Sequence, residues 1–237
     1  MIGYRASVSP ERSRDVLLVL LAATTGAVDA TAIERLGHVF ASVITGNLVL
    51  LGVSAVRNTQ DVALSSGCAL AGYAVGVLLA APRRSRGPRT PRRPPDDNVW
   101  PSGTTAALTI DLGLMVVFAA GWELAGGRPG RGAQTALLSI AAGAMGVQSS
   151  AVRRLGQMST TYLTSTLTGL LETAITRSWS AGDGRSAGIV AMAVAGAAGA
   201  TEILLHALAW LPVLPLLPLV TVVLLSRRLV QSESTTS

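Results

Sequence analysis

AATTGAVDATAIERLGHVFASVITGNL, residues 22–48, aligns with AAGAMGVQSSAVRRLGQMSTTYLTSTL, residues 141–167, when the chain is shifted by 119 positions. Nine positions are identical, including the consecutive Arg-Leu-Gly of residues 35–37 and 154–156. A Gly-rich segment follows each copy, AGYAVG at 71–76 and AGAAGA at 195–200, and a further apolar stretch follows that. This order predicts an internal repeat, with two pseudo-symmetric halves built on one plan.

The composition around the repeat is that of a membrane protein. Of 237 residues, 49% are hydrophobic and only 14% are charged, and the mean hydropathy is +0.49. Soluble domains carry about 25% charged residues, so this chain cannot cover a water-facing surface in the usual way. The single cysteine, Cys68, excludes a disulfide framework and a cysteine-rich zinc or iron–sulfur site. We expect no metal and no cofactor.

Eight apolar segments approach the length of about 20 residues that a membrane span requires. They predict an all-α, polytopic helical membrane bundle. No stretch outside them is long enough for a soluble catalytic domain. The segments are 16–33, 38–56, 62–82, 104–125, 133–152, 158–176, 187–209 and 211–226.

The arginines indicate how many segments cross. All 19 basic residues are Arg, and eight crossings would leave ten on one side and nine on the other. If 38–56 and 158–176 are broken or re-entrant, one side holds fifteen and the other four. Basic residues in short loops mark the cytoplasmic side, so this favours six full spans with both termini cytoplasmic. Seven spans, with only 158–176 re-entrant, give thirteen against six, and seven or eight spans remain alternatives.

The same placement predicts the domain organisation. We expect a cytoplasmic N-terminal tail at 1–13, a single transmembrane domain at 14–228 and a disordered tail at 229–237. The first half would be 14–125 with a basic loop at 83–103, and the second half 133–228.

The stretch GAVDATAIERLGHVFASVITGNLVLLG (26–52) resembles the signature of the YoaK-like family, multi-pass bacterial membrane proteins of unknown function. The second-half stretch GVQSSAVRRLGQMSTTYLTSTLTGLL (146–171) is similar to the same family, except that Ser165 stands where the family usually has Gly. The resemblance covers about residues 14–228. It implies a bacterial inner (plasma) membrane location and no known activity.

Polar residues inside the spans are the candidate site. Asp29 lies deep in the first segment, where a charge is costly and by default functional. Its counterpart in the second half is Gln148. Thr45, Gly46 and Asn47 correspond to Thr164, Ser165 and Thr166, a mixture that suits a helix break able to bind a solute. The alternative is structural: a hydrogen bond from Asp29 to a neighbouring helix and close packing of small residues.

Three further acids or bases are a candidate proton relay. Glu202 and His206 are spaced i, i+4 on one helix face, and Asp111 lies within the fourth segment. The simpler interpretation of Glu202 and His206 is a structural pair near the membrane interface, which we favour.

Two other features have structural interpretations. Gly72 and Gly76 form a GxxxG pattern, echoed by Gly196 and Gly199, which predicts helix packing within the chain or across a homodimer. The basic loop is expected to contact anionic lipid head groups and not nucleic acid. Its arginines are Arg83, Arg84, Arg86, Arg89, Arg92 and Arg93.

These features favour a transporter or channel for a small solute or ion, with its site at the interface of inverted repeats. Two alternatives stay open. One is a non-catalytic interaction or scaffold protein. The other is an intramembrane enzyme, for which Asp29 and Asp111 would be the acidic pair, although no H-E-x-x-H or G-x-S-x-G motif is present.

Overall fold

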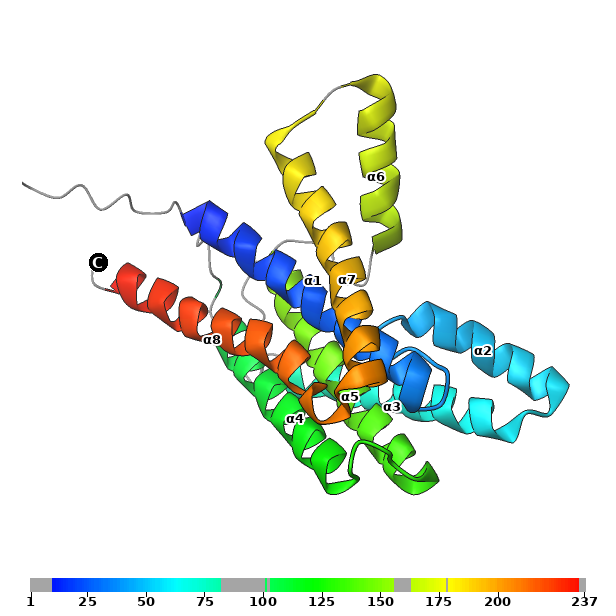
Figure 1. Cartoon of the computed structure of the whole chain (residues 1–237). Coiled ribbons are helices and arrows are strands. Elements are labelled where there is room, and N and C mark those ends of the chain that lie inside the picture. Colours follow the sequence, from blue (N-terminus) through cyan, green and yellow to red (C-terminus); the bar gives the residue numbers. More distant parts are fainter. Residues whose placement is uncertain (1–9, 82–100, 102, 156–162, 178, 235–237) are drawn as a thin grey trace, which may run out of the picture.

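The computed structural model describes residues 10–81, 101, 103–155, 163–177 and 179–234. In this part of the chain there are eight α-helices and no strand. A short 3-10 helix, Leu208–Trp210, precedes the last of them. The helices are α1 Pro10–Arg35, α2 Ile44–Arg57, α3 Gln60–Ala80, α4 Thr104–Leu124, α5 Arg131–Arg154, α6 Leu163–Thr176, α7 Ala181–His206 and α8 Val213–Ser234 (Figure 1).

Six of the eight helices are long and apolar enough to cross a membrane: α1, α3, α4, α5, α7 and α8. The other two, α2 and α6, have 14 residues each. A helix of that length spans about 21 Å, which is shorter than a hydrocarbon core of about 30 Å. The protein is therefore a polytopic helical bundle with six candidate spans, as the uneven distribution of arginines predicted.

The two ends of the bundle are defined by contacts between helix termini. At one end, a side chain added at Gly37, after α1, would collide with Ser65 of α3, and the indole Nε1 of Trp122 donates to the carbonyl of Leu208 at 3.1 Å. At the other end, Arg154 donates to the carbonyls of Ala80 and Gly103. Both connections of α2 lie at the first end, and the connection from α6 to α7 lies at the second. We call these the α2 end and the α6 end.

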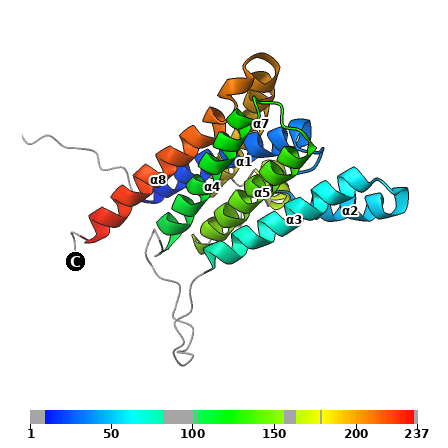
Figure 2. The ribbon, with the colours of Figure 1, turned by 90° about the horizontal axis from the view of Figure 1, so that it is seen from below.

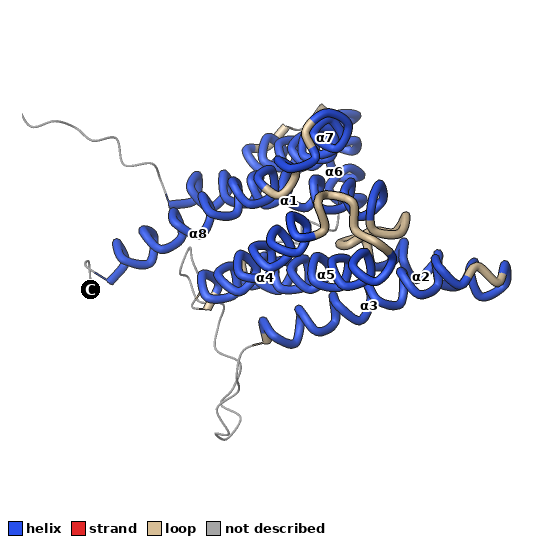
Figure 3. The backbone as a smooth tube through the Cα atoms, turned by 60° about the horizontal axis from the view of Figure 1, so that its bottom comes forward, coloured by secondary structure: helices blue, strands red, loops and turns tan. Residues whose placement is uncertain are grey.

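The helices form two layers (Figure 3). In each layer, the first helix of one half of the chain packs against two helices of the other half. The helix α1 packs against α7 and α8, whereas α5 packs against α3 and α4. Contacts of α4 with α8 and of α1 with α5 join the layers. The helices α1 and α5 are consequently central in the bundle. At the periphery, α2 lies beside α3 (Figure 2) and α6 beside α7 (Figure 1).

Glycines allow the helices of each layer to cross closely. A Cβ added at Gly26 or Gly196 would collide with a backbone carbonyl across the α1–α7 crossing. A Cβ added at Gly72 or Gly76 would collide with the backbone of α5 in the same way. Small residues permit such approach in membranes, where packing replaces the hydrophobic effect as the driving force.

The short helices α2 and α6 start later in the chain than the apolar segments 38–56 and 158–176 that predicted them. Residues 36–43 form an irregular turn in which Gly37 and His38 have positive φ values of 113° and 60°. Thr45, Gly46 and Asn47 therefore occupy the first turn of α2 and do not interrupt a helix. Likewise, Thr164–Thr166 occupy the first turn of α6. The chain turns before α2 starts, because Gly37 readily adopts a positive φ. The expected break within the helix is therefore wrong.

The terminal helices extend beyond the expected spans. The helix α1 begins at Pro10, a residue suited to the first helical position because its ring fixes φ. The helix α8 continues to Ser234, into the stretch that we expected to be a disordered tail. The arginines of 83–93, and with them the expected lipid contacts, lie outside the described residues.

Candidate functional site

Asp29 holds the turn that leads from α1 into α2. Its carboxylate accepts hydrogen bonds from the backbone N–H groups of Ala41 and Ser42, at 2.9 and 2.8 Å. It also accepts one from the hydroxyl of Ser42, at 2.5 Å. Three donors thus satisfy this intramembrane carboxylate, which fits the structural alternative that the sequence left open.

Asn47 fixes the same turn from the other side. Its amide oxygen accepts from the backbone N–H of Phe40 at 3.0 Å, and its Nδ2 donates to the carbonyl of Phe40 at 2.6 Å. Asn47 is fully buried, whereas Thr45 is exposed. Asp29 and Asn47 together clamp residues 40–42 between α1 and α2.

Gln148, which the sequence alignment pairs with Asp29, joins the two layers. Its Nε2 donates to the hydroxyl of Thr25 at 2.8 Å and to the carbonyl of Leu21 at 3.2 Å, both on α1. The side chain is 1% exposed, and its Oε1 has no hydrogen-bond partner. Gln148 is therefore a bridge between α5 and α1, with one free acceptor.

The predicted site residues do not come together in one place. The short helix that carries Thr45, Gly46 and Asn47 packs on α3, and the one that carries Thr164, Ser165 and Thr166 packs on α7. In Figure 1, α2 lies beside α3 at the right of the bundle, whereas α6 lies beside α7 at the top.

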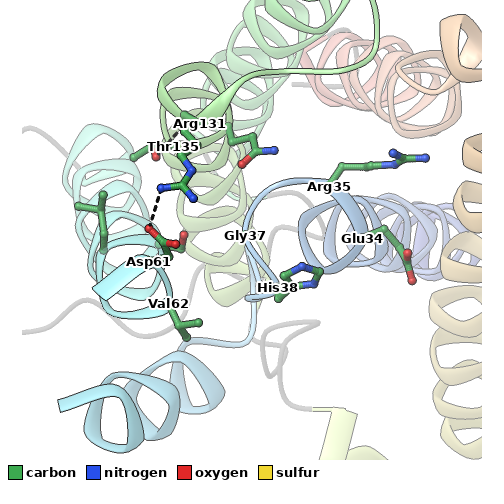
Figure 4. A pocket seen from close by; sticks show the side chains of 11 residues that line it. Glu34, Arg35, Gly37, His38, Asp61, Val62, Arg131 and Thr135 are labelled. Carbon is green, nitrogen blue, oxygen red and sulfur yellow. Dashed lines mark hydrogen bonds and ion pairs between the residues drawn. The ribbon is translucent and has the colours of Figure 1, made fainter. Parts of the chain in front are cut away.

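A polar cavity of about 340 Å³ lies at the α2 end, and we call it the α3–α5 cavity (Figure 4). Asp61 of α3 and Arg131 of α5 form an ion pair at 3.5 Å within it, with both side chains mostly exposed. Three parts of the chain contribute the lining: the end of α1 with the turn that follows it, the first turns of α3 and the first turns of α5. The lining residues are Glu34, Arg35, Gly37, His38, Asp61, Val62, Leu64, Ser65, Arg131, Gln134 and Thr135.

A second polar cavity, of about 400 Å³, lies toward the α6 end between α1, α6 and α7, and we call it the α6–α7 cavity. Asp15 of α1 and Arg185 of α7 form an ion pair at 3.1 Å beside it. Of the predicted site residues, Ser165 and Thr166 line this cavity. The complete lining is Leu18, Ser165, Thr166, Gly169, Leu170, Glu172, Thr173, Asp183, Arg185, Ser186 and Ile189.

Sequence reasoning missed the charged residues of both cavities. Asp61, Arg131, Asp15 and Arg185 all lie in the first turns of spanning helices. At that position they resemble ordinary charges at a membrane interface. The signal that was available is the predicted repeat, because its shift of 119 residues pairs Arg131 with Arg12 and thus the start of α5 with the start of α1.

Asp111 is the most unusual polar residue of the bundle. It is 0% exposed, and neither carboxylate oxygen has a hydrogen-bond partner. It lies seven residues from the start of α4 at the α6 end, whereas Asp29 lies six residues from the end of α1 at the α2 end. At 1.5 Å per residue, each aspartate lies about 10 Å along its helix from a different end of the bundle. The two carboxyl groups are therefore at different depths, which does not support an aspartyl pair.

The remaining predicted residues have simple surroundings. The carboxylate of Glu202 lies 3.3 Å from Nε2 of His206, and both side chains are about 70% exposed at the end of α7. Gly199 faces the side chain of Leu214 on α8. Among the residues that the structure describes, no group of three or more His, Cys, Asp or Glu side chains could hold a metal ion.

Six candidate spans, a polar cavity toward each end and charged side chains at the helix starts define a multi-pass helical membrane protein. Residues 17–225 match a family described as protein of unknown function (DUF1275), and the chain belongs to this family. It is similar to the UPF0700 transmembrane protein YoaK of Bacillus subtilis (strain 168), with 35% identity over 161 residues. That alignment covers 67% of this chain and 66% of the relative, slightly less than two thirds of its length. No solved structure matches the chain.

Proposed function

We propose that this protein moves a small polar solute or ion across the membrane, as a transporter or channel, and that the α3–α5 and α6–α7 cavities receive the solute from opposite sides. The observation that carries the proposal is the position of the cavities. One is built on the first turns of α3 and α5, and the other on the first turns of α7 and α1 with the adjoining α6.

The two cavities occupy corresponding places if the halves are a repeat. A shift of 119 residues carries the bounds of α2, residues 44 and 57, onto those of α6, residues 163 and 176. The same shift relates α3 to α7 and α1 to α5. Since α1 starts at the α6 end and α5 starts at the α2 end, the repeats are inverted. Inverted repeats are the plan of many secondary transporters, in which one repeat moves against the other.

The charges of the cavities indicate the kind of solute. The α3–α5 cavity offers Arg35 and Arg131 together with Glu34 and Asp61. The α6–α7 cavity likewise combines Arg185 with Glu172 and Asp183. Volumes of 340 and 400 Å³ lie at the small end of the range for ligand sites. A small molecule that carries both charges, or a small ion with its counter-ion, suits them best.

We assign the polar residues predicted from the sequence to two roles in this proposal. Ser165 and Thr166 contact the solute in the α6–α7 cavity. Asp29, Asn47 and Gln148 position α2 and α5 around the path, through the hydrogen bonds described above. Thr45, Gly46 and Thr164 belong to the first turns of the same two short helices, which would move as the cavities open and close.

The orientation follows from charge. Fifteen of the nineteen arginines belong to segments at the α6 end, so that end is assigned to the cytoplasm together with both termini. A bacterial inner membrane fits the similarity to YoaK of Bacillus subtilis. The α6–α7 cavity would then be cytoplasmic and the α3–α5 cavity external.

Flux into proteoliposomes, measured across a panel of amino acids, small organic ions and inorganic ions, tests the proposal. Arg131→Gln and Arg185→Gln remove one cation from each cavity and are expected to reduce flux of the transported compound. The matched controls are Arg128→Gln and Arg177→Gln, exposed arginines that line neither cavity. If no compound moves, or if the controls lose as much flux as the cavity variants, the proposal fails.

A non-catalytic interaction protein is the second candidate, because α2 exposes apolar side chains. Leu48, Val49 and Val56 are 54%, 66% and 89% exposed. Lipid covers such faces as readily as a protein does. Chemical crosslinking in native membranes distinguishes the two, since a partner would give a defined product through cysteines placed on α2.

A further inference from the structure

The interior of the bundle holds one carboxyl group that nothing described in this structure neutralises. Asp111 lies on the buried stripe of α4 with Leu108 and Met115, and all three side chains are 0% exposed. Both of its oxygens lack a hydrogen-bond partner. Asp29, the other acid deep in the described spans, accepts three hydrogen bonds. The hydrogen bonds of Asp29 stabilise its carboxylate, whereas the Asp111 carboxyl group has no partner and needs a further ligand.

The helices around Asp111 supply no counter-charge. α4 packs against α5 and α8. The only charged residues of α5 are Arg131, Arg153 and Arg154, all at its ends. Those of α8 are Arg227, Arg228 and Glu233, near its C-terminus. Arg227 and Arg228 are exposed, and neither interacts with the Asp111 carboxylate. The guanidinium of Arg154 donates to the carbonyls of Ala80 and Gly103, beyond the start of α4.

An ionised carboxylate without a donor or cation is too costly at such a position. Transfer of an isolated charge into an apolar medium costs far more than protein stability can supply, so the group takes up a proton instead. A metal ion is a poor alternative, because hard cations require several oxygen ligands. No group of three or more His, Cys, Asp or Glu side chains gathers anywhere in the described residues.

We propose that Asp111 is a proton-binding site, occupied in the conformation seen here, and that its proton is the coupling ion of transport. This inference rests on the proposed function. The closed α4 interface accommodates only the neutral acid, so release of the proton requires that α4 separate from α5 or α8 and admit water. Binding of a proton consequently stabilises the closed arrangement, and a proton gradient biases the equilibrium between the two.

The protonation state can be measured without any transported solute. The full chain, labelled with ¹³C at its aspartate carboxyl carbons and reconstituted in liposomes, is examined by solid-state NMR and infrared spectroscopy at neutral pH. We expect the signal of one protonated carboxyl group, retained in Asp29→Asn and lost in Asp111→Asn. If the wild-type protein shows no protonated aspartate, or if Asp29→Asn abolishes the signal, the assignment to Asp111 is overturned.

Transport provides the second measurement. In proteoliposomes loaded with a solute that the wild type moves, we expect Asp111→Asn to lose accumulation driven by a pH gradient. Glu123→Gln, the matched change at an exposed position of the same helix, should retain it. Asp111→Glu, which keeps a carboxyl group, is the variant to use if Asp111→Asn does not elute as a folded protein. Labelled at its glutamate carboxyl carbons instead, it should show the signal of one protonated carboxyl group.

The failures of the two proposals are distinguishable. If Asp111→Asn still accumulates solute against its gradient when only a pH gradient is applied, the coupling role is overturned while transport stands. If wild-type liposomes move no solute, the proposed function and the coupling role both fail, whatever the spectra show.

Discussion

The side-chain nitrogen of Gln148 lies 2.8 Å from the hydroxyl oxygen of Thr25, and this hydrogen bond joins α5 to α1 across the two layers of the bundle. The same hydroxyl donates to the carbonyl of Leu21 at 3.0 Å, which also accepts from Gln148. The indole of Trp122 on α4 makes another polar contact across the layers, with the carbonyl of Leu208. In a membrane, interhelical hydrogen bonds of this kind contribute modestly, about 0.6 kcal/mol on average.

The first prediction is the size of that contribution. A double-mutant cycle of Thr25→Val and Gln148→Met, measured by unfolding in mixed micelles, should give a coupling energy of about 0.6 kcal/mol. Two single variants whose effects simply add would mean that Gln148 and Thr25 do not interact. A control cycle pairs Gln148→Met with Thr221→Val, because Thr221 bonds only within α8 and should show no coupling.

The second prediction concerns the turn between α1 and α2. Asp29→Leu leaves the backbone N–H groups of Ala41 and Ser42 without an acceptor, at a cost of about 1–3 kcal/mol for a buried unsatisfied donor. Asp29→Asn keeps one oxygen and should cost less. Thermal unfolding of the two variants checks the order. Equal stability of Asp29→Leu and the wild type would contradict the anchoring role.

The third prediction compares two helical glycines. A Cβ at Gly76 would collide with the backbone of Gly143, whereas nothing lies within 4 Å of the Cβ position at Gly113. Gly113→Ala should therefore stabilise the protein by up to about 1 kcal/mol, because alanine favours the helix. Gly76→Ala should destabilise it by about 1–3 kcal/mol, because α3 and α5 must separate. If both variants have the same stability, the close crossing of α3 and α5 is wrong.

The fourth prediction is the topology. In a Cys68→Ser background, single cysteines at His38 and Asn58 should be labelled by an impermeant thiol reagent from one side of the membrane. Cysteines at Arg153 and Arg177 should be labelled from the other side. Labelling of positions 38 and 58 from opposite sides would mean that α2 crosses the membrane.

The all-helical fold and the six long helices could be predicted because they depend on quantities that a sequence displays directly. Segment length and hydropathy identify the candidate spans, and the fifteen-to-four division of arginines favours six of them. The positions of individual polar residues depend instead on tertiary packing. The sequence of α1 or of α5 alone does not indicate which helices it packs against. That packing depends on close contacts between helices, such as those of Gly26 and Gly76 with the backbone of a neighbouring helix.

The candidate site was accessible to sequence reasoning only in part. Asp29 and Asp111 look equivalent as acids within apolar segments. The structure separates them, because Ser42 lies near one and no donor lies near the other. Ser165 and Thr166 were singled out by their alignment with Gly46 and Asn47, yet they line a cavity and those residues do not.

The last prediction compares the ion pairs of the two cavities. Asp15 and Arg185 lie 3.1 Å apart with side chains 35% and 24% exposed, and Asp61 and Arg131 lie 3.5 Å apart with 78% and 88% exposed. Water screens the second pair more, so double-mutant cycles with Asn and Gln should give it a coupling energy of only a few tenths of a kcal/mol. The first pair should approach about 1 kcal/mol and should lose less of it in high salt. Arg14 also approaches Asp15, at 4.0 Å, so the cycle must be repeated in an Arg14→Gln background. Equal coupling energies in the two pairs would contradict this prediction, because the α1–α7 ion pair is the less exposed of the two.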